Sequence, residues 1–273
     1  MKKKMMAAFF AMALMAGLPA QERIVSLNGN ISEILCALGL EQQIAGVDVT
    51  STYPASLQAK PKLGHNRNIS AEGVLSLQPT LVLGLSEQFN PALTEQLKAT
   101  KTKTLIFQQD LSVQGVRHLL EEIGRATGTS DKAAGLGREF DRQIAALPSA
   151  SSGKKVLFIY ARGAGTLMVS GTGTAMDKMI KLAGGKNAVT DFSDFKPLAA
   201  ESLVAADPDL ILLFDSGLKS VGGIDGLLQI PGIAQTRAGK NRKIISMDGE
   251  LLSGFGLRLP QAIRELQDKI GQQ

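Results

Sequence analysis

The sequence predicts an α/β protein with two lobes built to one plan. One 14-residue pattern occurs twice, at residues 70–83 (SAEGVLSLQPTLVL) and at residues 199–212 (AAESLVAADPDLIL). Each copy reads as a short helix, a proline stop and a buried strand. Glu72 and Glu201 hold the same place in the two copies, 129 residues apart. Each lobe is therefore expected to present one acidic side chain at the same surface position.

The elements that would open each lobe also correspond. Residues 24–27 and 156–160 are short apolar runs, and each is followed by a glycine-containing loop and a helix. These helices, residues 32–39 and 177–184, both end in glycine, the usual residue just past a helix C-terminus. Repeated strand-loop-helix units occur in any α/β protein, so chance similarity between the two halves is the alternative. The shared offset of Ala, Glu, Pro and two Leu favours duplication.

The first twenty residues have the pattern of an export signal. Three lysines precede an apolar run at residues 5–17, and residues 18–20 form a small-residue exit that predicts cleavage before Gln21. The apolar run is too short for a helix that spans a bilayer. A membrane anchor is the alternative interpretation.

The only cysteine, Cys36, lies within the mature chain, on a predicted apolar helix at residues 31–38. It does not stand at the cleavage site, where a lipid would be attached, and one thiol forms no internal disulfide. A small buried side chain is favoured over a reactive thiol. We therefore expect a soluble protein exported to the periplasm without a lipid anchor.

Composition limits the partners. The chain has 273 residues, of which 44% are hydrophobic, enough for one large or two modest domains. Its formal net charge of +5 includes the three lysines of the leader, so the mature chain is close to neutral. Aromatic residues make up 4% and tryptophan is absent. Neither charge nor aromatic content fits nucleic-acid binding.

Two helices are expected between the lobes, at residues 112–127 and 130–147, with a break near Gly128 and Ser130 as N-cap. The second carries one apolar stripe, formed by Leu136, Phe140, Ile144 and Leu147. It is expected to join the lobes, although it can equally pack on the surface of one. The predicted division is a signal peptide at 1–20, an N-terminal lobe at 21–129, a linker helix at 130–150 and a C-terminal lobe at 151–273.

Four segments carry a resemblance to a known family. They are residues 23–35 (RIVSLNGNISEIL), 46–54 (GVDVTSTYP), 62–73 (KLGHNRNISAEG) and 247–258 (MDGELLSGFGLR). Together they resemble periplasmic haem-binding proteins of bacterial ABC importers, in the helix-linked class (class III) that also includes cobalamin and siderophore binders. The resemblance implies two Rossmann-like lobes joined by one long α-helix. It also implies that haem is held in the interlobe cleft and passed to an inner-membrane permease dimer with its ATPase.

In that wider class, acidic residues at the two lobe tips meet arginines of the two permease subunits, so the resemblance assigns transporter docking to Glu72 and Glu201. A duplicated acid suits a symmetric dimer, because each pair repeats the same contact. The alternative is that each carboxylate merely stabilises the first turn of its helix.

The resemblance assigns His65 as an axial ligand of the haem iron. Haem-binding relatives usually carry a tyrosine at this position, and neutral imidazole is also a common haem ligand. Arg67, two residues on, is expected to pair with a haem propionate through parallel hydrogen bonds. A single loop histidine is more often structural, but its place within the motif favours ligation.

Two further residues are weaker candidates. Met168 follows the first strand of the second lobe and is a possible second iron ligand, or else packs against the ligand or the core. Arg258 is expected either to meet a propionate or to form a surface ion pair. His118 is expected on a solvated or packed helix face, outside the site. Tyr53 and Tyr160 are alternative iron ligands, because phenolate is the usual donor in the family, but packing in a turn and in a strand is favoured for them.

Other functions fit less well. A zinc or manganese binder needs three or four ligands, but the chain has two histidines, neither in metal-binding spacing. A cobalamin or siderophore binder is the serious alternative, because lobes and docking acids would be the same. No Walker A, G-x-S-x-G or H-E-x-x-H motif is present, so the sequence does not predict an enzyme.

Overall fold

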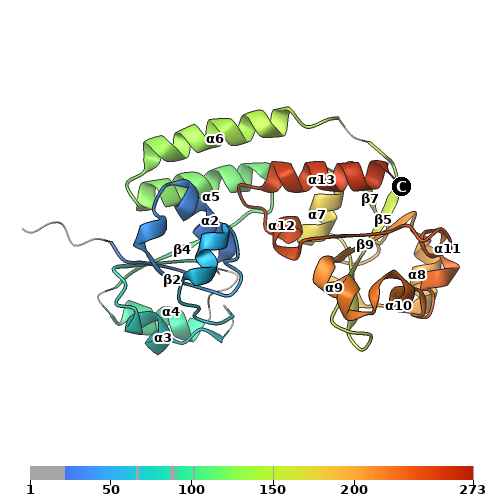
Figure 1. Cartoon of the computed structure of the whole chain (residues 1–273), viewed down its shortest axis with the longest axis horizontal. Helices are drawn as coiled ribbons and strands as arrows, with labels where there is room; N and C mark the ends of the chain where they lie inside the picture. The colour runs from blue at the N-terminus through green and yellow to red at the C-terminus, as the bar shows by residue number, and fades with distance from the viewer. Residues whose placement is uncertain are drawn as a thin grey trace, which may run out of the picture.

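Two separate β-sheets, one from each half of the chain, form the two lobes of the molecule (Figure 1). The computed structural model describes residues 22–65, 68–86, 89, 91–100, 102–149 and 151–272. Within these ranges no helix combines the length and the apolar character needed to cross a bilayer. The predicted signal peptide at residues 1–20 lies outside the described residues.

The N-terminal sheet has four parallel strands in the order β2-β1-β3-β4. They are β1 (Ile24–Ser26), β2 (Ile44–Val47), β3 (Leu81–Leu85) and β4 (Lys103–Phe107). The helices are α2 (Gly29–Ala37), α3 (Ala71–Ser76), α4 (Pro91–Lys98) and α5 (Val113–Ala126), with short 3-10 turns at Glu41–Gln43 and Ala55–Ala59. One face of the sheet is buried under α2 and α5, and the other under α3 and α4.

The C-terminal sheet has six strands and runs β10-β9-β5-β6-β8, with β7 also paired to β5. Its strands are β5 (Lys155–Ala161), β6 (Leu167–Ser170), β7 (Lys186–Asn187), β8 (Phe195–Pro197), β9 (Leu210–Phe214) and β10 (Ile244–Met247). Whereas β10, β9, β5 and β7 pair in parallel, β6 runs antiparallel to both β5 and β8. This antiparallel extension has no counterpart in the N-terminal sheet.

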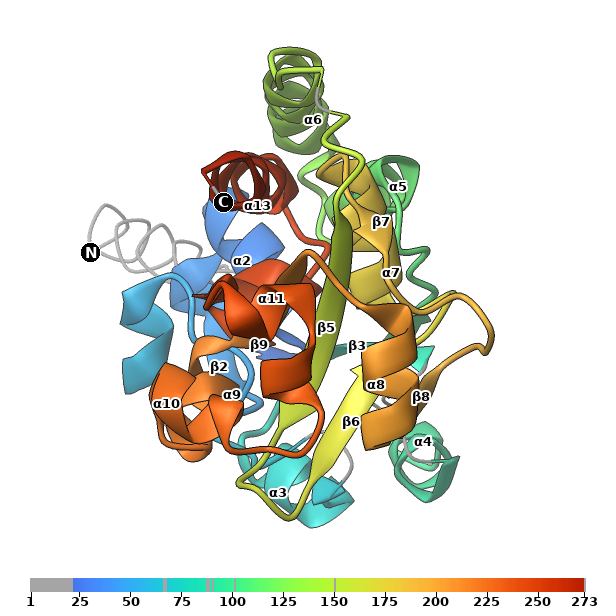
Figure 2. The ribbon, with the colours of Figure 1, turned by 90° about the vertical axis from the view of Figure 1, so that its right-hand side faces the viewer.

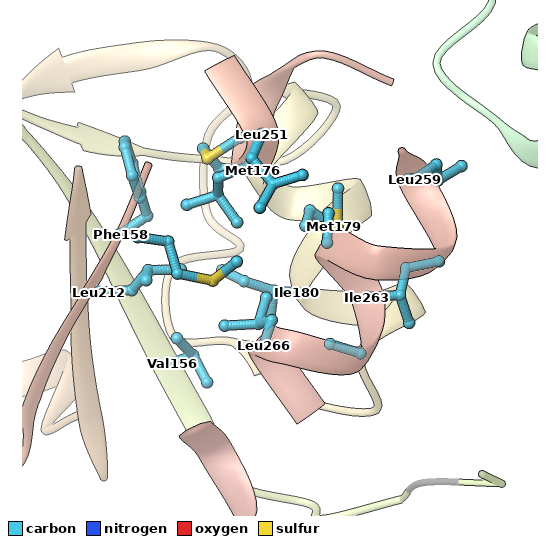
Figure 3. Close-up of a cluster of buried hydrophobic side chains, with 14 of the residues drawn as sticks. Val156, Phe158, Met176, Met179, Ile180, Leu212, Leu251, Leu259, Ile263 and Leu266 are labelled. Carbon is cyan, nitrogen blue, oxygen red and sulfur yellow. The ribbon is translucent and has the colours of Figure 1, made fainter. Parts of the chain in front are cut away.

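Helices cover both faces of the C-terminal sheet. The face toward the N-terminal lobe packs on α7 (Ala175–Leu182), α12 (Gly249–Ser253) and α13 (Leu259–Gly271), and Figure 3 shows Phe158, Met179 and Leu266 in this core. The outer face packs on α8 (Ala200–Ala206), α10 (Gly223–Leu228) and α11 (Arg237–Lys240). Between these, α9 (Asp215–Ser220) follows β9, and Ile233–Gln235 is a 3-10 turn.

The duplicated pattern folds as predicted. In each copy a short helix, α3 or α8, leads through a proline into the central strand β3 or β9. The residue before each proline, Gln78 or Asp207, has a left-handed backbone, with φ of 48° and 39°. Non-glycine residues seldom adopt this conformation, so its recurrence at equivalent positions supports a common plan for the two lobes.

The helix between the lobes, α6 (Ser130–Ala145), contributes to both cores. Leu136 packs against the N-terminal core, whereas Phe140, Ile144 and Leu147 pack against the C-terminal core. Figure 1 shows α6 running along one side of the N-terminal lobe and ending near α13, where the C-terminal lobe begins. The predicted stripe is confirmed, but the predicted cap is wrong: Thr129 is the N-cap, without a side-chain hydrogen bond to the helix, and Ser130 is already helical. Gly128 has a left-handed backbone, with φ of 67°, and the helix starts two residues later. The N-cap therefore stands one residue before the predicted position.

Polar contacts also join the lobes. Asn30 of α2 donates through Nδ2 to the carbonyl of Gly254, and Gln109 Nε2 donates to the carbonyl of Phe255 at 2.8 Å. We call these two contacts the interlobe clamp. A methyl group on Gly256 would lie 2.8 Å from Asn30 Oδ1, so glycine is needed for the approach. The clamp therefore brings the segments around Asn30 and Gly256 into contact, although they lie far apart in the chain.

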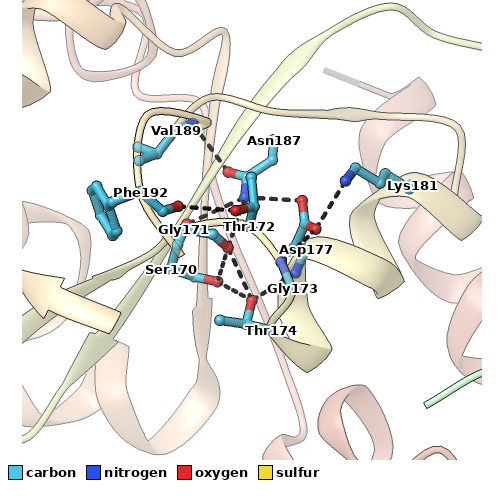
Figure 4. Close-up of polar contacts among 10 residues, drawn as sticks. All are labelled: Ser170, Gly171, Thr172, Gly173, Thr174, Asp177, Lys181, Asn187, Val189 and Phe192. Atoms are coloured by element: carbon cyan, nitrogen blue, oxygen red, sulfur yellow. Dashed lines mark hydrogen bonds and ion pairs between the residues drawn. The ribbon is translucent and has the colours of Figure 1, made fainter. Parts of the chain in front are cut away.

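A buried network fixes the turn between β6 and α7 (Figure 4). The carboxylate of Asp177 accepts hydrogen bonds from Gly173 N at 3.0 Å, Lys181 Nζ at 2.8 Å and Asn187 Nδ2 at 3.2 Å. Thr174 Oγ1 caps α7 by accepting from the Asp177 amide at 3.0 Å. The network therefore holds β6 in place at the edge of the parallel strands.

The substitution Asp177→Asn tests how far this network stabilises the fold. Burial raises the pKa of Asp177, but the hydrogen bonds from Lys181, Gly173 and Asn187 and the Lys181 charge outweigh it, so the pKa lies below its ordinary value. Such a carboxylate adds stability at neutral pH that is lost as the pH falls through the lowered pKa. We expect a loss of about 1–3 kcal/mol in unfolding free energy at pH 7, and a smaller loss at pH 3.

Urea unfolding at the two pH values measures this difference. Asp225→Asn is the control, because Asp225 pairs with Arg242 at 2.6 Å on an exposed surface. It should change stability by less than about 0.5 kcal/mol. An equal loss for Asp177→Asn at both pH values would contradict the assignment.

Candidate functional site

The chain beyond β2 forms the N-terminal side of the candidate site. The buried carboxylate of Asp48 accepts from the hydroxyls of Thr50 at 2.6 Å and Ser51 at 2.7 Å, which fixes the turn. The Val49 amide then donates to the Gly64 carbonyl at 3.1 Å, so this turn is tied to the loop that carries His65. Ligands of open α/β sheets bind beyond the carboxyl ends of the strands, and this turn lies there.

His65 is exposed, and its carbonyl accepts from the Asn68 amide at 2.7 Å. The neighbouring turn also exposes two large apolar side chains, Val49 by 43% and Tyr53 by 49%. Exposed groups of this kind beside a polar loop are typical of a surface that receives a ligand. Arg67, expected from the sequence to bind a propionate, lies outside the described residues.

Arg258 lies between the lobes and is engaged by two side chains. Its Nε donates to Glu33 Oε2 of α2 at 2.8 Å, and its guanidinium lies 4.0 Å from the centre of the Tyr53 ring. Burial raises the pKa of Glu33 and outweighs the stabilisation of its charge by Arg258. The structure contains an ion pair of Arg258, but the pair is largely buried between the lobes, whereas a surface pair was expected. Contact with a propionate stays a prediction.

An aromatic wall forms the C-terminal side. We define it as Tyr160, Met168, Phe195 and Phe214, which lie on the sheet face that is turned toward the N-terminal lobe. Tyr160 and Met168 are direct cross-strand partners on β5 and β6. The ring of buried Phe158 contacts Phe214 and Phe195 edge-on, at centroid distances of 4.9 and 6.4 Å. Phe195 is 36% exposed, so the wall is open to a planar ligand.

Arg162 follows Tyr160 by two residues and lies with its guanidinium 5.9 Å from the centre of the tyrosine ring. Tyr160 also meets Phe214 edge-on at 6.3 Å. Sequence reasoning treated Tyr160 as packing and missed this pair. The available signal was the spacing, because residues two apart at the end of a strand lie on one side of the sheet.

A carboxylate of α12 lies close to this region. Burial raises the pKa of Glu250 to about 7, the charges of Asp48 and Asp248 add to the rise, and Arg258 opposes it. Glu250 keeps contact with solvent.

A hollow of about 590 Å³ lies elsewhere, on the outer side of the C-terminal lobe beside α8. Its lining includes Leu157, Val169, Phe192, Lys196 and Leu203, but no histidine, tyrosine, cysteine or methionine. It therefore lacks the side chains that bind haem iron. Nor do the described residues contain a group of three His, Cys, Asp or Glu that is able to hold a metal ion.

Glu72 and Glu201 are both exposed in the first turns of α3 and α8. In Figures 1 and 2, α3 and the hairpin between β5 and β6 lie at the end of the molecule opposite α6. The chain leaves β8 toward α8 beside this hairpin, since Leu198 N bonds to Leu167 O at 3.0 Å. The two acids thus stand on equivalent helices near one end of the molecule.

Solved structures of the same fold give close matches. The periplasmic heme-binding protein RhuT from Roseiflexus sp. RS-1 has 40% sequence identity and a TM-score of 0.87, over 92% of this chain and 98% of RhuT. The heme-binding protein BhuT, solved with two hemes, has 36% identity and the same TM-score, over 92% of this chain and 98% of BhuT. The fold is therefore that of the helix-linked, class III binding proteins.

Curated relatives are more distant. An uncharacterized ABC transporter substrate-binding lipoprotein of Bacillus subtilis, YvrC, is 29% identical over 257 residues, covering 91% of this chain and 80% of YvrC. A cobalamin-binding protein of Halobacterium salinarum is 29% identical over 200 residues, which is 70% of this chain but only 53% of that protein. The family model for periplasmic binding proteins matches residues 24–251. The chain therefore belongs to the periplasmic binding protein family, whose members bind substrates for transport.

Proposed function

We propose that this protein binds haem between its lobes and delivers it to an inner-membrane ABC permease dimer with its ATPase, in a pathway of iron acquisition. The observation that carries the proposal is the arrangement of two unlike walls at the strand ends: a loop with His65 on one lobe and an aromatic wall on the other. A porphyrin needs flat apolar surfaces together with an axial donor. The haem-binding relatives at 36 to 40% identity support the same cargo.

His65 is the proposed axial ligand from the N-terminal lobe. A neutral imidazole donates a nitrogen lone pair to iron and binds both ferrous and ferric haem. The exposed side chains of Val49 and Tyr53 beside it supply apolar surface for the porphyrin edge. Arg67 is the proposed partner of a propionate.

On the opposite wall, Tyr160 is a better proposed second ligand than Met168. The two side chains share one face of the sheet, so either reaches the same ligand position. The oxygen of a tyrosine is a known haem ligand, and the Arg162 guanidinium, 5.9 Å from the centre of the Tyr160 ring, places a positive charge beside this candidate. Met168 then packs against the porphyrin, the second of the two roles expected for it.

Domain boundaries and location complete the proposal. We place the N-terminal lobe at 21–129, the linker helix at 130–150 and the C-terminal lobe at 151–273, behind a cleaved leader at 1–20. The protein acts as a periplasmic monomer without catalytic turnover. Cys36 lies half-buried within α2 of the folded lobe, which does not suit a lipid-attachment site at the start of a mature chain. The relative YvrC is a lipoprotein, so mass spectrometry of the mature chain tests this point.

Cobalamin is the second candidate cargo, because relatives that bind it cover 70% of the chain. An imidazole and an aromatic wall suit a corrinoid as well. Addition of each ligand to the purified protein distinguishes them, since bound haem gives a Soret band and cobalamin does not.

The absorption spectrum tests the proposed ligands. We expect His65→Ala to shift the Soret band of the haem complex and to weaken binding at least about tenfold. We expect Tyr160→Phe to remove the visible bands of a ferric phenolate while leaving the fold intact. Met168→Leu, its cross-strand partner, is the matched control and should leave the spectrum unchanged. A wild-type spectrum in both His65→Ala and Tyr160→Phe would place the iron elsewhere.

Docking is tested by the pair Glu72→Ala and Glu201→Ala. We expect the double variant to lose haem-stimulated ATPase activity of the reconstituted transporter, because each lobe loses its charge contact, while haem affinity stays normal. Glu139→Ala with Glu265→Ala removes two acids from α6 and α13 as a control. Normal delivery by the Glu72 and Glu201 double variant would refute docking through these acids.

A further inference from the structure

An apolar hollow of about 360 Å³ adjoins the helix that carries Glu201. Three segments form it: the β5–β6 hairpin, the start of α8 and the turn after α10. Its apolar lining comprises Ala164, Leu167, Leu198, Ala200, Ile230 and Pro231. The hairpin lies at the same end of the molecule as α3, the helix of Glu72, and far from α6 (Figures 1 and 2).

The walls of this hollow are held in place by hydrogen bonds. Arg162 N donates to Thr166 O at 3.0 Å across the hairpin tip, and Gly163 N donates to Ser220 Oγ of α9 at 2.9 Å. On the other side, Gly232 has φ of +90° and approaches Ala200 so closely that a methyl group there would lie 3.0 Å from it. The hollow is therefore preformed, and filling it requires little ordering of the protein.

Val204 extends the apolar surface along α8. It is 39% exposed, one of five large apolar side chains so exposed among the described residues. It follows Ala200 by four residues and Glu201 by three, so all three share one flank of the helix. Leu203, by contrast, is buried and anchors α8 to the sheet.

The N-terminal copy repeats only part of this surface. Leu75 stands at the same distance from Glu72 as Val204 does from Glu201, and it packs partly into its own core. The hollow depends on Leu167, the first residue of β6, and Leu198, which follows β8; the described part of the N-terminal sheet has no strands equivalent to these two. Each lobe thus has an acid with an apolar residue three positions later, and the C-terminal lobe has the hollow in addition.

We propose that the hollow and Val204 receive an apolar side chain of the transporter, presented next to the cation that pairs with Glu201. This inference rests on the proposed docking of Glu201. Exposed ion pairs contribute little to affinity, whereas apolar side chains seated in pockets supply most of the binding energy of interfaces. The acid then sets orientation, and the hollow supplies the affinity of the complex.

The test measures the affinity of the haem-loaded protein for the transporter in nanodiscs. We expect Val204→Asp and the hollow-filling Ala164→Trp each to weaken the complex at least tenfold, with haem titration unchanged. Ile106→Asp is the matched control, because Ile106 is 36% exposed on the strand β4 of the other lobe. It should change the affinity less than twofold.

The outcomes separate this inference from docking itself. If Glu201→Ala weakens the complex while Val204→Asp and Ala164→Trp bind like wild type, docking stands and the hollow is excluded as an anchor. If the double variant Glu72→Ala with Glu201→Ala keeps haem-stimulated ATPase activity, the proposed docking fails and the inference with it. Binding of wild type to protein-free vesicles of the same lipids, lost in Val204→Asp at unchanged transporter affinity, would assign the surface to lipid and overturn the proposal.

Discussion

The rest of the structure depends on how the two lobes are held relative to each other. One helix, α6, places Leu136 in one core and Phe140 in the other, so the lobes cannot separate without exposing apolar side chains. The interlobe clamp and the buried Arg258–Glu33 pair add polar contacts between the lobes. The relative position of the two lobes, and with it that of the two walls of the proposed site, is therefore set before any ligand arrives, and a rigid planar cargo suits such a preformed site.

The sequence predicted what local patterns determine. The repeat around Glu72 and Glu201 gave both helix-proline-strand units, and the apolar stripe from Leu136 gave α6, because 3.6-residue periodicity and proline act locally. The antiparallel β6 and β8 were not predicted, since short strands with mixed polarity carry no clear period. The clamp was also missed: Asn30 and Gly254 lie far apart in the chain, and nothing in either segment marks its partner.

The candidate site likewise combines features that the local sequence predicts with features that only the folded structure determines. His65 stood out through its motif, but the aromatic wall follows from strand register, which brings Met168 opposite Tyr160 and Phe195 onto the Phe158 ring. The guanidinium of Arg258 was expected at a ligand or in a surface ion pair. Its partners Glu33 and Tyr53 could not be predicted, because they lie more than 200 residues away in the chain and meet it only through the packing of the lobes. Exposed apolar side chains connect the two proposed activities: Val49, Tyr53 and Phe195 lie at the proposed haem walls and Val204 at the docking end.

The central claim is that haem lies between the loop of His65 and the aromatic wall. A crystal structure of the haem complex tests it most directly. We expect the iron to be bonded to the His65 imidazole, with the porphyrin against Tyr160 and Phe195 and the interlobe clamp intact. Haem seated in the 590 Å³ hollow beside α8, or held without any bond to His65, would contradict it.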